Sequence, residues 1–97
     1  MMTLNQIKKI INQNLSVIQD KYRVKEIGIF GSYATGHQHK DSDVDVLVEF
    51  GGSITLFKYA ELQNFLVDQL HVKVDLVQKS GLKPLIKDEI LSETIYI

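Results

Sequence analysis

Two carboxylates one residue apart, with a Gly-Ser pair shortly before them, are the residues of this chain best suited to chemistry. Asp43 and Asp45 stand at the start of one apolar run, and Gly31-Ser32 directly follows another. Because alternate residues of a strand point to the same face, both carboxylates are expected to project together. Like charges ~5 Å apart repel each other by of order 1 kcal/mol or more unless a cation neutralises them. The pattern therefore suits a divalent metal with a phosphate chain across it, which is the chemistry of nucleotidyl transfer.

The Gly-Ser pair has two interpretations. Gly31 lets the backbone turn sharply and approach a ligand closely, and Ser32 offers a hydroxyl and an amide to a phosphate oxygen. A short helix that begins near Ser32 would add free N–H groups and a positive helix end. The alternative is a plain turn, because short glycine motifs are common. Asp43 and Asp45 have a similar alternative, a solvated turn at the exposed start of their strand.

Asp75 is a third candidate carboxylate. It lies in the middle of a predicted strand, where a charge is costly without a partner. If this strand pairs beside that of Asp45, Asp75 can ligate a metal and take the proton from an attacking hydroxyl. An ion pair with Lys73 or another lysine would explain the residue equally well.

The elements that position these residues follow from the spacing of apolar side chains. Residues 4–19 are predicted to form an amphipathic helix, with Thr3 and Gln6 as its capping box. The remaining pattern predicts strands over Val24–Phe30, Asp43–Phe50 and His71–Gln78, a helix over Thr55–Leu70, a short last helix with Pro84 in its first turn, and a final extended piece over Ile95–Ile97. This order indicates an α/β (α+β) fold, a small mixed β-sheet flanked by helices.

Length and composition narrow the class of protein. The 97 residues are expected to form a single domain over 1–97, and 44% apolar with 24% charged residues is typical of a soluble globular protein. The net charge of −1 argues against direct nucleic-acid binding, which needs a basic face. The absence of cysteine excludes disulfides and Cys-based zinc sites. No apolar run approaches 18 residues, so we expect no membrane partner and a cytoplasmic location.

Three other residues invite a functional interpretation. His37 and His39 have the spacing of metal ligands, but no third ligand is near them in the sequence, so we interpret them as loop residues that are either exposed to solvent or adjacent to the substrate. Tyr33 can either stack on a nucleotide base or cap the core.

The motif resembles that of a known family. The segment GSYATGHQHKDSDVD has the complete pattern GSxxxG(x)nSDxD, followed by the strand with Asp75. It resembles the minimal nucleotidyltransferase branch of the DNA polymerase β-type nucleotidyltransferase superfamily, and the resemblance extends through residues 93–97. It implies the polymerase β-like palm fold, with Gly31 and Ser32 holding the phosphates of ATP. Asp43 and Asp45 would bind two Mg²⁺ ions, and Asp75 would join one metal and act as base.

The resemblance also implies a partner. Relatives of this branch are often encoded beside HEPN-domain proteins, so AMP would pass from ATP to a tyrosine of a cognate HEPN ribonuclease toxin, an antitoxin activity. One alternative is a non-catalytic binding module that acts by occlusion. Another is nucleotidyl transfer to a small molecule such as an aminoglycoside. Thr35 stands where many relatives carry an Arg that can meet phosphates bidentately, and weaker nucleotide binding would favour occlusion.

Overall fold

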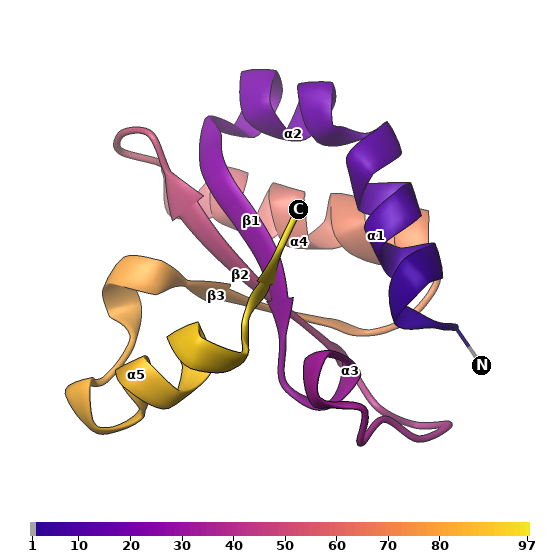
Figure 1. Cartoon of the computed structure of the whole chain (residues 1–97). Helices are drawn as coiled ribbons and strands as arrows, with labels where there is room; N and C mark the ends of the chain where they lie inside the picture. The colour runs from indigo at the N-terminus through magenta and orange to yellow at the C-terminus, as the bar shows by residue number, and fades with distance from the viewer. Residues whose placement is uncertain (1) are drawn as a thin grey trace.

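The computed structural model describes residues 2–97, which form a mixed four-stranded sheet with helices packed around it (Figure 1). The strands are β1 (Val24–Phe30), β2 (Val44–Phe50), β3 (Val74–Gln78) and β4 (Ile95–Tyr96). The helices are α1 (Leu4–Gln13), α2 (Leu15–Tyr22), α3 (Ser32–Thr35), α4 (Leu56–Leu70) and α5 (Pro84–Glu93), with a 3-10 turn, η1, at Lys79–Gly81. The predicted fold class, a small mixed sheet flanked by helices, is confirmed.

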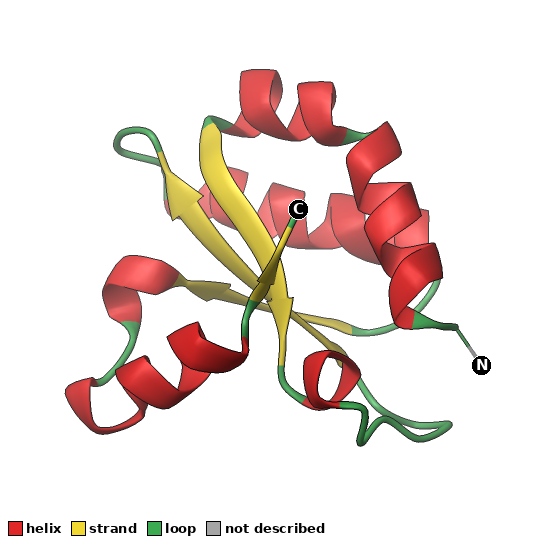
Figure 2. Cartoon of the chain, viewed as in Figure 1, coloured by secondary structure: helices red, strands yellow, loops and turns green. Residues whose placement is uncertain are grey.

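The order of strands decides which residues become neighbours. The strands lie in the order β3-β2-β1-β4. Strand β2 runs antiparallel to β1 and parallel to β3, and β4 pairs antiparallel with the other side of β1. Figure 2 shows the short helix α3 at the end of β1, close to the start of β2. The end of β1 and the starts of β2 and β3 therefore lie at the same end of the sheet.

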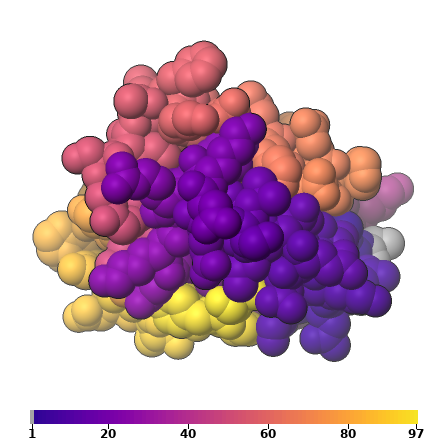
Figure 3. Space-filling view, turned by 90° about the horizontal axis from the view of Figure 1, so that it is seen from above, coloured from indigo at the N-terminus to yellow at the C-terminus, as the bar shows by residue number. Residues whose placement is uncertain are grey.

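The core lies between one face of the sheet and helices α1, α2 and α4. Alternate residues of β2 face this core, and Val44, Val46 and Val48 are fully buried there. Their partners from the helices include Ile7, Ile11, Ile18, Leu62, Leu66 and Leu70. Figure 3, seen from above, shows the N-terminal part of the chain, indigo to purple, from the right of the view to its middle, with the yellow C-terminal segment along the lower side. The opposite sheet face carries the intervening residues of β2, beginning with Asp45.

The predicted single helix over residues 4–19 is wrong, because the chain forms two helices that meet at Asn14. The Asn14 side chain donates to the Ile10 carbonyl at 2.8 Å, so it competes with the backbone for a helical acceptor. The capping box of Thr3 and Gln6 is confirmed. Apolar spacing alone could not reveal the break, because both helices bury their apolar residues in the same core.

The strand predictions differ from the structure mainly at their starts. Strand β1 has the predicted bounds, and β2 begins one residue later than predicted. Strand β3 begins at Val74 rather than His71, because His71 ends α4 in the left-handed conformation, with φ 58°. Strand β4 confirms the predicted extended piece at the end of the chain. None of the helices within residues 2–97 combines the length and apolar character that crossing a bilayer requires.

Candidate active site

The turn at Gly31 is built around the carboxylate of Asp45. Gly31 has φ 72° and ψ −148°, a conformation that side chains disfavour. A Cβ atom at this position would lie 2.0 Å from Oδ2 of Asp45. Phe30 is the residue paired with Asp45 across the two strands, so the turn begins where the carboxylate projects. Glycine is therefore required here both for backbone conformation and for space.

Helix α3 supplies the donors predicted near Ser32. The helix begins at Ser32, which confirms the predicted short helix. The Gly31 carbonyl accepts the Thr35 hydroxyl and the amides of Ala34 and Thr35, each at 3.1 Å. The first amides of a helix, here those of Ser32 and Tyr33, have no acceptor within the helix and so can serve a phosphate oxygen. The Tyr33 side chain is buried in the core, so it caps the core and does not stack on a base.

Strand pairing brings the predicted carboxylates together. Asp45 and Asp75 are direct partners in the parallel β2–β3 pair. Asp43 stands one residue before β2, on the face of Asp45 by alternation. Asp43 and Asp75 are exposed, whereas Asp45 is half-buried. The sheet thus places Asp45 and Asp75 side by side, with Asp43 at the same end of the strands.

The pKa of Asp45 reflects this crowding of negative charge. Burial is the largest cause that raises the pKa of the Asp45 carboxyl from 3.8 to about 6. The charges of Asp75, Asp43 and Glu93 add to the effect, in that order. Among residues 2–97, none of these four carboxylates takes part in an ion pair. The predicted alternative for Asp75, an ion pair with Lys73 or another lysine, is therefore wrong.

Helix α4 fixes the outer edge of β3 on both sides of Asp75. The Tyr59 hydroxyl donates to the Leu76 carbonyl, and Gln63 Nε2 donates to the Val74 carbonyl at 2.8 Å. Burial, followed by the charge of Asp75, raises the pKa of Tyr59. These two hydrogen bonds satisfy edge carbonyls that would otherwise face solvent. They hold the backbone around Asp75 in place.

Glu93 is the residue of this site that the sequence patterns did not indicate. Its Oε1 atom accepts the Gly31 amide at 3.0 Å, across a separation of 62 residues. The family resemblance extends to Glu93 but gives it no role, and its place in the site depends on the last helix packing back beside β1. The available signal was the predicted final strand, which had to pair somewhere in the sheet.

The carboxylates fit a magnesium ion by their donor chemistry. Within residues 2–97 no group of three or more His, Cys, Asp or Glu side chains is already arranged around one metal position. Mg²⁺ commonly uses one or two carboxylates and completes its shell with water and substrate phosphate. Asp45 with a neighbouring carboxylate supplies such a partial set. His37 and His39 are exposed, as predicted, and the His37 ring lies 3.0 Å from the Thr35 hydroxyl.

Comparison with known proteins gives the class and then the family. A chain in a solved structure described as a minimal nucleotidyltransferase superposes with a TM-score of 0.84 and 34% identity, covering 97% of this chain and 95% of that one. Residues 4–97 match the family described as "Nucleotidyltransferase domain", so this chain belongs to that family and is a nucleotidyltransferase.

Two further relatives bear on the activity. Protein adenylyltransferase MntA of Thermococcus cleftensis is 41% identical over 97 residues, which cover 100% of this chain and 98% of that protein. A chain from a crystal structure of a toxin–antitoxin with AMP-PNP has a TM-score of 0.69 and 26% identity. That match covers 95% of this chain and 69% of the other. The predicted resemblance to minimal nucleotidyltransferases is confirmed.

Proposed function

We propose that this protein transfers AMP from Mg-ATP to a tyrosine hydroxyl of a cognate HEPN ribonuclease toxin and thereby acts as its antitoxin. The observation that carries the proposal is the pairing of Asp45 with Asp75 beside the Gly31 turn, without a neutralising cation among residues 2–97. The likeness to a protein adenylyltransferase and to a toxin–antitoxin chain with AMP-PNP supports the donor and the kind of partner.

The site residues would have two roles, binding of the ATP triphosphate and activation of the attacking hydroxyl. Gly31, Ser32 and the first amides of α3 would bind the triphosphate. Asp43, Asp45 and Asp75 would hold two Mg²⁺ ions. When bound, these ions would neutralise charge on the phosphates and lower the pKa of the attacking hydroxyl. Asp75 would then accept the hydroxyl proton at a carboxylate oxygen, which is the role of a general base.

The sheet order supports a proposal for the direction from which the acceptor would approach. Strand β2 lies between β1, which leads into the Gly31–Ser32 turn, and β3, which carries Asp75. If pyrophosphate leaves on the β1 side, in-line displacement at the α-phosphorus requires the hydroxyl to enter from the β3 side. The bond from hydroxyl oxygen to α-phosphorus forms as the bond to pyrophosphate breaks. The exposed carboxylate of Asp75 lies on that side.

The antitoxin effect follows from the charge of the product. An AMP group on a tyrosine near a ribonuclease centre adds a negative phosphate and a bulky nucleoside there. Both would oppose the approach of RNA, whose own phosphates are negative.

The test is the intact mass of the toxin after incubation with Mg-ATP and trace amounts of this protein. We expect a gain in whole AMP units at substoichiometric amounts, and peptide mapping should place them on tyrosine. The double variant Asp43→Asn/Asp45→Asn serves as the blank. A stable one-to-one complex without any mass gain would overturn the proposal in favour of occlusion. AMP transfer to an aminoglycoside and not to the toxin would redirect it to small-molecule acceptors.

A further inference from the structure

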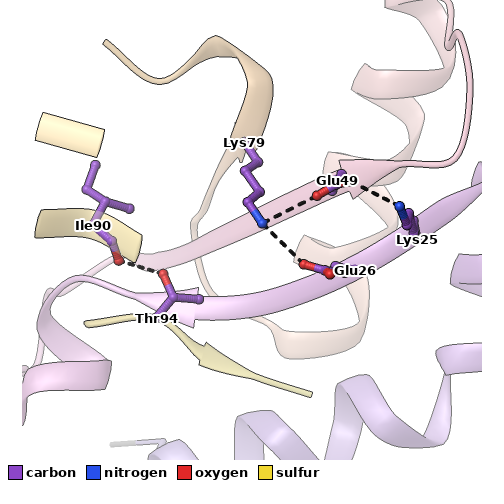
Figure 4. Close-up of polar contacts among 6 residues, drawn as sticks. All are labelled: Lys25, Glu26, Glu49, Lys79, Ile90 and Thr94. Atoms are coloured by element: carbon purple, nitrogen blue, oxygen red, sulfur yellow. Dashed lines mark hydrogen bonds and ion pairs between the residues drawn. The ribbon is translucent and has the colours of Figure 1, made fainter. Parts of the chain in front are cut away.

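Glu93 lies at the junction between α5 and β4, and contacts on both sides of it define its position. Glu93 is the last residue of α5, and the next residue, Thr94, donates its hydroxyl back to the Ile90 carbonyl at 2.7 Å (Figure 4). The chain then enters β4, where Ile95 pairs with Ile29 of β1. Glu93 is thus fixed between a closed helix end and a paired strand.

Gly28 permits this close approach. A Cβ atom at Gly28 would lie 2.7 Å from the Cγ2 atom of Thr94 and 3.0 Å from the Ile95 carbonyl oxygen. A larger residue would require the Thr94 side chain, which directly follows Glu93, or the backbone at Ile95 to shift. Two glycines of β1 and its following turn therefore bring both carboxylates to the same place, Gly28 for Glu93 and Gly31 for Asp45.

The hydrogen bond of Glu93 leaves the following amides free. Its carboxylate takes the N–H of Gly31, the residue that precedes α3. The amides of Ser32 and Tyr33 are the next two along the chain, and the geometry of a helix start gives them no internal acceptor. Glu93 therefore holds the turn from the side of α5 without using the donors that a phosphate needs.

We propose that Glu93 is a positioning residue of the nucleotidyl-transfer site. By accepting the Gly31 amide, it fixes the turn that supports the Asp45 carboxylate and orients the start of α3. The inference rests on the proposed function, because the turn matters for activity only if nucleotide phosphate and cation bind there. Residues that orient the direct ligands of a metal typically change affinity or activity by about 10–100-fold when removed.

The experiment compares three substitutions of the same residue with one control. Glu93→Gln keeps a carbonyl oxygen that can accept the Gly31 amide, whereas Glu93→Met has similar length and no such acceptor, and Glu93→Ala removes the side chain. Glu89→Ala, on the exposed side of the same helix, is the control. Affinity for Mg²⁺-AMP-PNP is measured by calorimetry, and the Gly31 amide resonance is followed by ¹⁵N NMR. The melting temperature of each variant shows whether it is folded.

We expect about 10–100-fold weaker Mg²⁺-AMP-PNP binding for Glu93→Met and Glu93→Ala, and binding within about threefold of native for Glu93→Gln and Glu89→Ala. The Gly31 amide resonance should move in the Met and Ala variants. Native affinity in a folded Met variant would overturn the inference, as would a Gln variant as weak as Ala. Failure of the proposed function is distinguishable, because the native protein itself would then transfer no AMP.

Discussion

The face of the sheet that carries Asp45 has carboxylates at both ends, and the two ends differ in whether lysines pair with these carboxylates. At the far end Glu26 of β1 is the strand partner of Glu49 of β2, and Lys79 lies 3.4 Å from both carboxylates (Figure 4). Lys25 adds a second contact to Glu49 at 3.5 Å. At the other end, which carries Asp43, Asp45 and Asp75 and is the proposed catalytic end, the carboxylates have no such lysine among residues 2–97.

The difference is that a lysine of the protein pairs with Glu26 and Glu49, whereas no ion pair within residues 2–97 involves Asp43, Asp45 or Asp75. Burial lowers the pKa of Lys79, but the charge of Tyr96, the hydrogen bond to Glu49, and the charge and hydrogen bond of Glu26 together raise it above its ordinary value. The pKa of Asp45 rises for the opposite reason, because burial and like charges disfavour its ionised form. On the proposed function, an external cation would therefore stabilise the end with Asp43, Asp45 and Asp75, where repulsion is not relieved by a lysine.

The largest expected effect is loss of transfer after neutralising the catalytic end. Asp43→Asn/Asp45→Asn should lower the rate of AMP transfer by at least 10²–10³-fold, since one charge-stabilising group in such a site contributes about 3–4 kcal/mol. The melting temperature should not fall, because the substitution also removes repulsion. Asp88→Asn/Glu89→Gln, with the same charge change on the exposed face of α5, is the control for the mass-spectrometric assay. Equal transfer by both double variants would contradict the metal role of Asp43 and Asp45.

The second effect comes from the turn that makes room for Asp45. Gly31→Ala should reduce transfer by about 10²-fold, because the new Cβ displaces a carboxylate that must be placed to within about 1 Å. It should also lower the free energy of unfolding by about 1–3 kcal/mol. Gly36→Ala is the matched control, because Gly36 has φ 80° and a Cβ atom there would meet nothing within 4 Å. In denaturant unfolding, Gly36→Ala should lower the free energy of unfolding by only the backbone strain of about 1–2 kcal/mol. Its rate of AMP transfer should stay within a few-fold of native.

The third prediction concerns pH and metal. Asp45 binds its proton more tightly in the folded protein, at a pKa of about 6 against 3.8, so its contribution to stability falls as pH rises from about 4 to about 6. Mg²⁺ should restore stability above pH 6, where the carboxyl is ionised, and have little effect below pH 4. The measurement is the difference in melting temperature between native protein and Asp45→Asn across this range. Sodium chloride at equal ionic strength controls for screening, and a difference independent of pH would contradict the prediction.

The smallest effect is expected at the far end. Lys79→Met should lower the melting temperature slightly and leave AMP transfer unchanged, because Glu26 and Glu49 then face each other without their shared cation. The decrease should shrink at high salt, since the side chains of Lys79, Glu26 and Glu49 are partly exposed to solvent. Lys87→Met, at an exposed lysine of α5 nearby, provides the comparison in the same thermal scans. A loss of transfer in Lys79→Met alone would show that the two ends are not independent.

Local patterns were sufficient for much of the fold and for the central motif. The apolar run and the residues around it predicted β1 with its bounds, and strand alternation predicted that Asp43 and Asp45 share one face. They failed at Asn14, where a side-chain hydrogen bond divides a helix whose apolar period continues unbroken. They also could not decide between a metal ligand and an ion pair for Asp75, because that choice depends on which strand lies beside it.

The sequence by itself was enough to predict that Gly31 and Ser32 at the end of one strand lie near Asp43 and Asp45 at the start of the next. Two strands joined by a short connection have few ways to arrange themselves. The assembled sheet was needed to place Asp75 opposite Asp45, through the parallel register of β2 and β3. It was also needed to bring Glu93 to the Gly31 amide. Both outcomes depend on contacts between segments far apart in the chain, whose pairing is selected by burial of the whole core and is not written in any short stretch of residues.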